Sequence, residues 1–270
     1  MSRSIHRQEP EVDWSRTSDD YATYRAGFPA RFFEELRLRG RIAPGMRALD
    51  VGTGTGTVAL GLAARGAAVT AIDPSGEQLA RARASAEAAG ARVRFRRATA
   101  EATGLDDGAV ELYTAGQAWH WFDRPAAAAE AHRVLVPTGT VVLAHLDYLD
   151  HPGDVVETTL RVIERHRPTT TGPLAIGRFS MRAFYGGWPD DLWGAGFRAL
   201  EAFAFDVDLP YTREAWRGRI RASAWIGASL APEEVEAFDR DLAAALQAFP
   251  PVLAVPHRVF AALGRKGGAA

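Results

Sequence analysis

A carboxylate and a run of glycines near residue 50 are the residues with the clearest chemical use. The loop is made of six residues with small or polar side chains: Asp50, Gly52, Thr53, Gly54, Thr55 and Gly56. Glycines behind a strand let the backbone turn tightly and approach a ligand, and a helix that follows them presents unpaired N–H groups. Those groups suit a ligand carboxylate, and the region near Asp50 suits a ligand amino group. The loop therefore predicts a site for a zwitterionic ligand that carries no phosphate.

A second acidic residue, Asp73, follows about 20 residues beyond this loop, at the end of the next expected strand, where a carboxylate commonly binds ribose hydroxyls. Pro74 and Ser75 complete the turn. The alternative is that Asp73 only caps the helix that begins there. A dinucleotide fingerprint would need a third glycine at position 57, where the chain has Thr57.

Aromatic residues cluster after the fourth expected strand, in the segment that contains Gln117, Trp119, His120 and Trp121. Aromatic faces attract cations and form flat walls for apolar ligands. The ordinary pKa of histidine suits a general base near neutral pH, so His120 is a candidate for that role. The alternative is a histidine packed between two tryptophans.

The elements that would position these residues alternate along the chain. Strands are predicted at 47–51, 67–72, 92–97, 110–115, 140–145, 197–207 and 257–263, and helices at 57–65, 76–89, 125–135, 154–166, 213–225 and 232–248. Such alternation predicts a doubly wound α/β fold with a mostly parallel, seven-stranded, Rossmann-like sheet. The carboxyl ends of its strands would then meet at one edge and carry the chemistry.

We expect a single domain over residues 1–270. An N-terminal helical arm would occupy about 1–40, with Pro29 opening its second helix and Gly40 closing it. Between about 148 and 190 the alternation fails, which predicts a helical cap inserted over the carboxyl edge, with loops that include 186–189. The basic run 92–97 is expected to form a strand at the edge of the sheet.

With these motifs in place, the chain resembles the class I S-adenosylmethionine (SAM)-dependent methyltransferases. The resemblance covers roughly residues 20–145 and rests on the glycine loop, the turn 71–75, the segment 99–101 and the segment 116–123. It implies that SAM lies on the glycine loop and that Asp73 binds its ribose. The segment with Thr99, Ala100 and Glu101 would contact adenine, although the family often has an aspartate where this chain has Thr99. Gln117 and Trp119 are further candidates for contact with the cofactor.

The resemblance also gives the N-terminal arm a role, because a related arm closes over the methionine end of the cofactor. Tyr21 and Arg25 would supply that contact; the alternative is a surface helix that packs on the domain. The His-Trp pair is similar to that of small-molecule methyltransferases of the trans-aconitate and juvenile-hormone-acid type, in which this loop faces the acceptor. This implies methyl transfer to an O, N or C atom of a small molecule, with a carboxylate or hydroxyl favoured and S-adenosylhomocysteine as product.

Two other functions fit the same sequence. One is a SAM-fold binding protein that does not transfer methyl groups, since fold and cofactor loop survive such a change. The other is a nicotinamide-dependent oxidoreductase, which the residue at position 57 disfavours.

Composition indicates which partners and which location the protein has. The formal net charge is −1 and the chain has no cysteine, which argues against nucleic-acid or anionic-lipid partners and against disulfides. No run is apolar and long enough for a membrane span or a signal peptide, so we expect a cytoplasmic protein, without preference for any oligomeric state. His145, Asp147, Asp150 and His151 are of metal-ligating types but lack a recognised spacing, so we expect no metal and assign the end of the fifth strand to the acceptor cavity.

Overall fold

The computed structural model describes residues 27–167, 185–223, 226–227 and 229–267. The predicted arm residues Tyr21 and Arg25 lie outside the described residues. The chain divides into two compact units. In the described ranges, one unit, which we call the sheet unit, comprises 27–148, 185–207 and 257–267; the other, the helical unit, comprises 149–167 and 208–256 with short gaps. The predicted single domain with a cap at about 148–190 stays a prediction.

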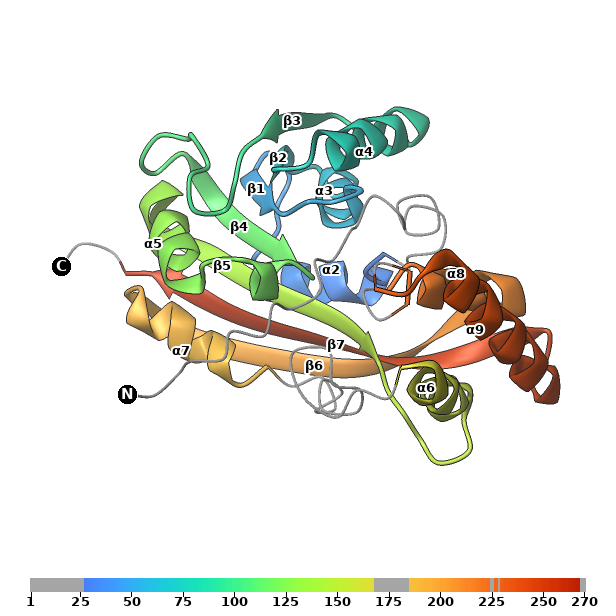
Figure 1. Ribbon diagram of the computed structural model, residues 1–270. Coiled ribbons are helices and arrows are strands. Elements are labelled where there is room, and N and C mark those ends of the chain that lie inside the picture. The colour runs from blue at the N-terminus through green and yellow to red at the C-terminus, as the bar shows by residue number, and fades with distance from the viewer. Residues whose placement is uncertain (1–26, 168–184, 224–225, 228, 268–270) are drawn as a thin grey trace, which may run out of the picture. The chain divides into compact units, whose positions relative to one another are not determined.

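A seven-stranded sheet has the order β3-β2-β1-β4-β5-β7-β6 (Figure 1) and lies in the sheet unit except for residues 208–212 of β6 and 252–256 of β7. Its strands are β1 (Arg47–Val51), β2 (Ala68–Asp73), β3 (Val93–Arg97), β4 (Val110–Gly116), β5 (Leu135–Tyr148), β6 (Phe197–Thr212) and β7 (Val252–Lys266). Strands β1 to β5 pair in parallel, and β7 pairs antiparallel to β5. The predicted doubly wound, mostly parallel fold is confirmed, and the basic strand β3 lies at the sheet edge as predicted.

The strand order fixes where a ligand is expected. From β1 the chain steps outward to β2 and β3, then returns to place β4 on the opposite side of β1. In open α/β sheets, ligands bind outside the carboxyl ends of the strands at such a reversal. The carboxyl ends of β1 and β4 are therefore the centre of any site that this sheet carries.

Helices cover both faces of the sheet. They are α2 (Ala30–Leu38), α3 (Thr57–Ala63), α4 (Gly76–Ala88), α5 (Arg124–Val134) and α7 (Gly187–Gly194). On one face, Tyr113 and Ala115 of β4 share a buried core with α5 and α7. On the other face, Gly116 is approached by α3, because a Cβ there would lie 2.5 Å from Cγ2 of Val58. This alternation along β4 is the two-residue period of a strand whose two faces are both buried.

Local signals explain the helix boundaries near the carboxyl edge. The Ser75 hydroxyl accepts a hydrogen bond from the backbone of Gln78 and caps α4. The Asp123 carboxylate accepts from the backbone N–H of Ala126 and caps α5. These caps satisfy N–H groups that the first helical turn leaves without partners. Pro29 precedes α2 as predicted.

Two sequence predictions in this unit need correction. Residues 186–189 were expected to form a loop, but 187–189 are the start of α7, whose Trp188 and Leu192 are buried. Pro189 is tolerated because it stands in the first helical turn, where its missing N–H removes no helical hydrogen bond. Strands β5, β6 and β7 are also longer than predicted. For β5 and β7 the reason is their mutual pairing, which runs without a break from Thr140 to Tyr148 of β5.

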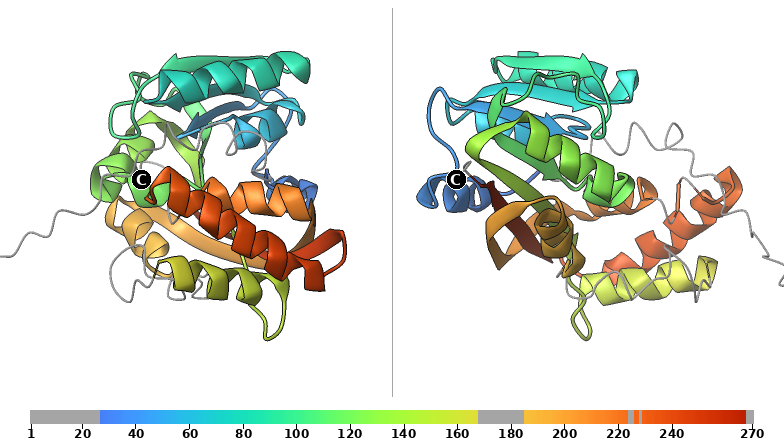
Figure 2. Two further views of the ribbon diagram at one scale, coloured as in Figure 1. Left: turned by 45° about the vertical axis from the view of Figure 1, so that its right-hand side comes forward. Right: turned by 90° about the vertical axis from the view of Figure 1, so that its left-hand side faces the viewer.

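The helical unit contains α6 (Val155–His166), α8 (Arg213–Arg221) and α9 (Pro232–Ala245). Within it α9 contacts both other helices (Figure 2). The buried indole of Trp216 donates to the Thr159 hydroxyl at 2.9 Å, which joins α8 to α6. Arg217 and Arg221 of α8 both bind the Asp239 carboxylate on α9. No helix among the described residues is long and apolar enough to cross a membrane.

Candidate active site at the carboxyl ends of β1 and β4

The glycine loop joins β1 to α3 and keeps an open surface. Gly52, Gly54 and Gly56 have φ values of 62°, 54° and 88°, a region that favours glycine. A Cβ on Gly52 would lie 2.6 Å from Cβ of Ala118, so the loop and the segment after β4 approach closely. A Cβ on Gly54 would meet no described atom within 4 Å. The backbone at Gly54 is therefore accessible to a ligand.

Asp50, at the end of β1, is almost completely buried beneath this loop. The Thr53 hydroxyl donates to its carboxylate at 2.6 Å and the Thr114 hydroxyl donates at 2.8 Å. Burial raises the pKa of Asp50 to about 6, although both hydroxyls act in the opposite direction. The negative charge of Asp50 thus lies in a poorly solvated place, where a nearby cation would be attracted to it.

Asp73, at the end of β2, holds the loop in place from the other side. One carboxylate oxygen accepts from the backbone N–H of Gly54 and the other from that of Ser75, each at 2.9 Å. The helix cap at this turn is Ser75 itself, so Asp73 is not the helix cap that the sequence left open as an alternative. Each carboxylate oxygen can accept a further hydrogen bond, and binding of ribose by Asp73 stays a prediction.

Replacing Asp73 with alanine is expected to weaken SAM binding by about 1–3 kcal/mol, through loss of a charge-assisted hydrogen bond. Because the carboxylate also holds the loop, the affinity of SAM alone would not separate the two effects. Titration of adenosine and 2′,3′-dideoxyadenosine into both proteins does so as a double-mutant cycle. The hydroxyl groups should improve binding to the wild type only; an equal improvement in the variant would contradict contact with the ribose.

The loop after β3 carries the predicted adenine segment. Thr99 is exposed, Ala100 is buried, and Glu101 accepts from the backbone N–H of Asp123 at 3.0 Å. The carbonyl oxygen of Pro74 accepts from the Arg97 guanidinium at 2.8 Å. The loop is thereby joined both to the turn after β2 and to the segment after β4.

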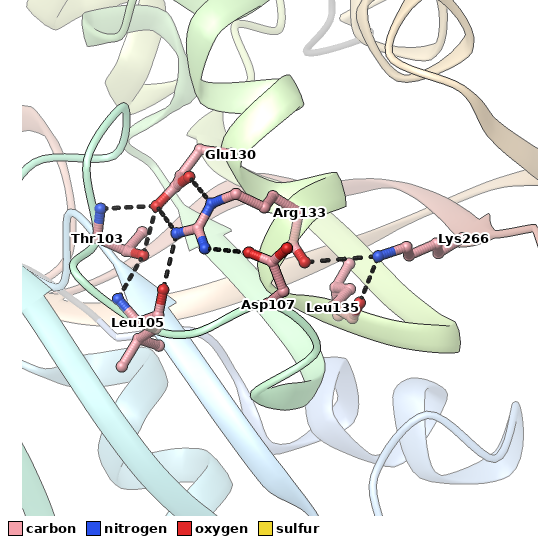
Figure 3. Close-up of polar contacts among 7 residues, drawn as sticks. All are labelled: Thr103, Leu105, Asp107, Glu130, Arg133, Leu135 and Lys266. Carbon is pink, nitrogen blue, oxygen red and sulfur yellow. Dashed lines mark hydrogen bonds and ion pairs between the residues drawn. The ribbon is translucent and has the colours of Figure 1, made fainter.

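The ion pair between Glu130 and Arg133 of α5 anchors the same loop (Figure 3). The Glu130 carboxylate accepts from the backbone and hydroxyl of Thr103 at 2.9 and 2.6 Å. Arg133 binds Glu130 through two nitrogens and donates to the Leu105 carbonyl at 2.8 Å. The hydrogen bonds from Arg133 lower the pKa of Glu130 to about 2 despite partial burial. Helix α5 therefore fixes the path of the loop that holds Thr99–Glu101.

The aromatic segment after β4 begins with a strained turn. Gln117 has a φ of 57°, and its backbone N–H donates to the carbonyl of Ala144 on β5 at 2.8 Å. The first aromatic residue of the segment, Trp119, is fully buried, and its indole N–H donates to Asp191 of α7 at 2.9 Å. The side chain of Trp119 therefore packs in the core of the sheet unit, and cofactor contact by this residue stays a prediction.

The other two aromatic residues of the segment face outward. His120 and Trp121 lie on a short 3₁₀ helix, η2 (Trp119–Trp121), and their ring centroids are 4.8 Å apart. Trp121 is 58% exposed, an unusual position for so large an apolar side chain. Both residues are thus accessible next to the glycine loop.

A group of polar side chains at the end of β5 was only partly found from the sequence. The Tyr185 hydroxyl contacts the carboxylate of Asp147, and it lies 3.0 Å from Nδ1 of His145. The same nitrogen lies 3.2 Å from the Asp147 carboxylate. The sequence pointed to His145 and Asp147, whereas Tyr185 gave no signal because it follows them by about 40 residues. Asp150 and His151 belong to the helical unit, and the described residues contain no cluster of three metal-ligating side chains.

The strand order and the two helical layers are those of the Rossmann-like fold of methyltransferases. Residues 49–143, which span β1 to β5, match a family model described as a methyltransferase domain. The matched segment includes the glycine loop, Asp73 and the aromatic segment.

Individual proteins agree with that match. An uncharacterized methyltransferase of Mycobacterium tuberculosis is 41% identical over 137 residues, which are 51% of this chain and 53% of the relative. A solved structure from Anaeromyxobacter dehalogenans, classed by inference as a type II methyltransferase, aligns with a TM-score of 0.64 and 25% identity over 91% of this chain and all of its own. A [4+2]-cyclase aligns with a TM-score of 0.53 and 21% identity over 91% of this chain and 84% of its own, which shows a common fold.

The chain thus spans about half the length of the first of these relatives.

Proposed function

We propose that this protein is an enzyme that transfers the methyl group of SAM to a small-molecule acceptor and releases S-adenosylhomocysteine. The observation that supports this most is the open backbone at Gly54, between the Asp50 and Asp73 carboxylates at the point where the strand order reverses. An amino acid joined to a nucleoside and carrying no phosphate matches such a site, because it offers a cation, a carboxylate and ribose hydroxyls.

The residues that would hold SAM are those predicted from the sequence. Gly52–Gly56 would receive the methionine part, with the Asp50 charge favouring its ammonium group. Asp73, Pro74 and Ser75 would lie along the ribose, and Thr99–Glu101 would lie along the adenine. Tyr21 and Arg25 stay candidates for the arm over the methionine end.

The acceptor is proposed to lie against His120 and Trp121. Methyl transfer requires an acceptor atom in line with the sulfonium methyl, and positioning alone can supply about 7–11 kcal/mol of the barrier. The methyl group can go to oxygen, nitrogen or carbon in this proposal. We also propose a cytoplasmic protein with small-molecule partners and without a nucleic-acid or membrane partner.

Two alternatives are separated by one experiment. A nicotinamide-dependent oxidoreductase is disfavoured because Thr57, the first residue of α3, occupies the place of the third dinucleotide glycine. A binding protein that does not transfer methyl groups is compatible with the fold, which a [4+2]-cyclase also has. Incubation with methyl-labelled SAM and a panel of small acceptors should release S-adenosylhomocysteine and label an acceptor; retention of intact SAM would favour the binding protein.

Replacing Trp121 with alanine is expected to lower kcat/KM for the acceptor by roughly 10–100-fold, from the lost apolar contact, with SAM affinity changed less than about twofold. Steady-state kinetics on any acceptor found in the panel provide the measurement. Trp193→Ala is a matched control, because this residue is also 58% exposed but lies on α7. Equal kcat/KM in wild type and Trp121→Ala would contradict this placement of the acceptor.

A further inference from the structure

His145 is a buried imidazole whose hydrogen-bonding partners among the described residues lie at one ring nitrogen, Nδ1. It is 7% exposed, and its Nδ1 lies 3.0 Å from the Tyr185 hydroxyl and 3.2 Å from the Asp147 carboxylate. Trp188 stacks on the Tyr185 ring with centroids 4.5 Å apart, which adds an aromatic wall to the cluster. No hydrogen bond among the described residues is found at Nε2 of His145. The arrangement therefore leaves one ring nitrogen for a ligand.

The partners of Nδ1 determine where the proton of the neutral ring lies. The Asp147 carboxylate can only accept, and the Tyr185 hydroxyl donates its single hydrogen to Asp147. Burial and the Asp147 charge raise the pKa of Tyr185 above its ordinary value, so this hydroxyl keeps its hydrogen. Both partners of Nδ1 thus act as acceptors. The ring proton must lie on Nδ1, and Nε2 carries the lone pair.

The cluster lies next to the proposed acceptor position. The rings of His145 and His120 have centroids 5.3 Å apart, and β5 continues directly from its pairing with the end of β4. Among the described residues, the ionisable groups Asp147, Tyr185 and His120 lie next to the His145 ring. Arg258 stands opposite Asp147 on β7, but its guanidinium binds Asp206 at 2.6 and 2.7 Å.

We propose that His145 is the catalytic base of the methyl transfer, with Asp147 and Tyr185 as positioning residues, and that the acceptor is a hydroxyl or amine compound. The inference rests on the proposed methyltransferase function. The acceptor oxygen or nitrogen forms a bond to the methyl carbon, and the carbon–sulfur bond breaks with its electron pair left on sulfur. The acceptor proton passes to Nε2 of His145, and the resulting imidazolium is stabilised by the Asp147 carboxylate. A carboxylate acceptor would need no such base, because it carries no proton at neutral pH.

The test has one readout that needs no turnover. Nitrogen-15 NMR of the histidine side chains should show His145 with its proton on Nδ1 in the wild type, with the signal assigned by its loss in His145→Gln. A wild-type ring protonated on Nε2 alone would overturn the proposal. His132→Gln is the matched control, since this histidine is half-buried in the same unit and contacts Phe197 instead of the cluster.

The second readout is turnover with phenols, primary alcohols, primary amines and carboxylic acids, followed by release of S-adenosylhomocysteine. We expect His145→Gln to lower kcat for hydroxyl or amine acceptors by about 10²–10⁴-fold with unchanged SAM affinity. Asp147→Asn should give a smaller loss, and the control His132→Gln the smallest. A merely structural role would lower turnover of every acceptor class alike.

The outcomes separate this proposal from the one on which it rests. If SAM does not bind, the proposed function fails and the base assignment fails with it. If SAM binds and carboxylic acids are methylated but hydroxyl and amine compounds are not, the methyltransferase proposal stands and His145 is not the base. Equal kcat in His145→Gln and His132→Gln would overturn the assignment in the same way.

Discussion

Replacing Gly54 with valine is expected to reduce SAM affinity by at least about 100-fold, which corresponds to about 2.7 kcal/mol. No described atom lies within 4 Å of a Cβ at this position, so the folded protein has room for the side chain. A ligand on the loop would compete for the same space, and a well-packed contact does not tolerate the extra carbons. Isothermal titration calorimetry of SAM into both proteins measures the change.

The control for this variant is Gly45→Val. Gly45 has a φ of 78°, and a Cβ there also meets nothing within 4 Å. Both variants therefore carry similar backbone strain, about 1–2 kcal/mol or more, but Gly45 precedes β1 and lies away from the carboxyl ends of the strands. We expect Gly45→Val to bind SAM as the wild type does. Equal affinities in the two variants would show that the glycine loop does not hold the ligand.

Replacing Glu130 with alanine is expected to destabilise the protein by about 2–4 kcal/mol, because the buried Thr103 loses the acceptor of both its hydrogen bonds and Arg133 loses one of its two carboxylate partners. The pKa of Glu130 is lowered in the folded state to about 2, below its ordinary value of 4.5. Its contribution is therefore fully present above about pH 4.5 and is lost as the pH falls toward 2. Urea unfolding of wild type and variant between pH 3 and pH 7 should show a stability difference that narrows toward acid.

Asp107→Asn is the matched control for this prediction. Asp107 binds the same guanidinium at 2.6 Å, but its side chain is 83% exposed. Exposed pairs contribute about 0–1 kcal/mol, so the control should unfold close to the wild type. If both variants lose the same stability, the carboxylate of Glu130 does not anchor the loop after β3.

The parts of the fold that could be predicted are those with local signals. The apolar strands, the glycines and the capping residues Ser75 and Asp123 each act within a few residues of the chain. They located β1 to β4 and the turns at their carboxyl ends to within a residue or two. The strand order then follows from how alternating strands and helices pack.

The errors came from contacts between distant residues. Helix α7 was missed because glycine and proline at 186–189 usually signal a loop, whereas burial of Trp188 and Leu192 outweighs that local preference. The burial of Trp119 could not be predicted either, because its hydrogen-bond partner Asp191 comes 72 residues later. The arrangement of His145, Asp147 and Tyr185 likewise depends on tertiary packing, which no spacing in the sequence records.

The central claim is that the loop at the carboxyl end of β1 is a SAM site, and titration of the wild-type protein with SAM and NAD⁺ in parallel tests it most directly. We expect SAM to bind saturably at one site per chain and to be displaced by S-adenosylhomocysteine. We expect no binding of NAD⁺ under the same conditions. Binding of NAD⁺ with no binding of SAM would contradict it, and so would the absence of binding by either ligand.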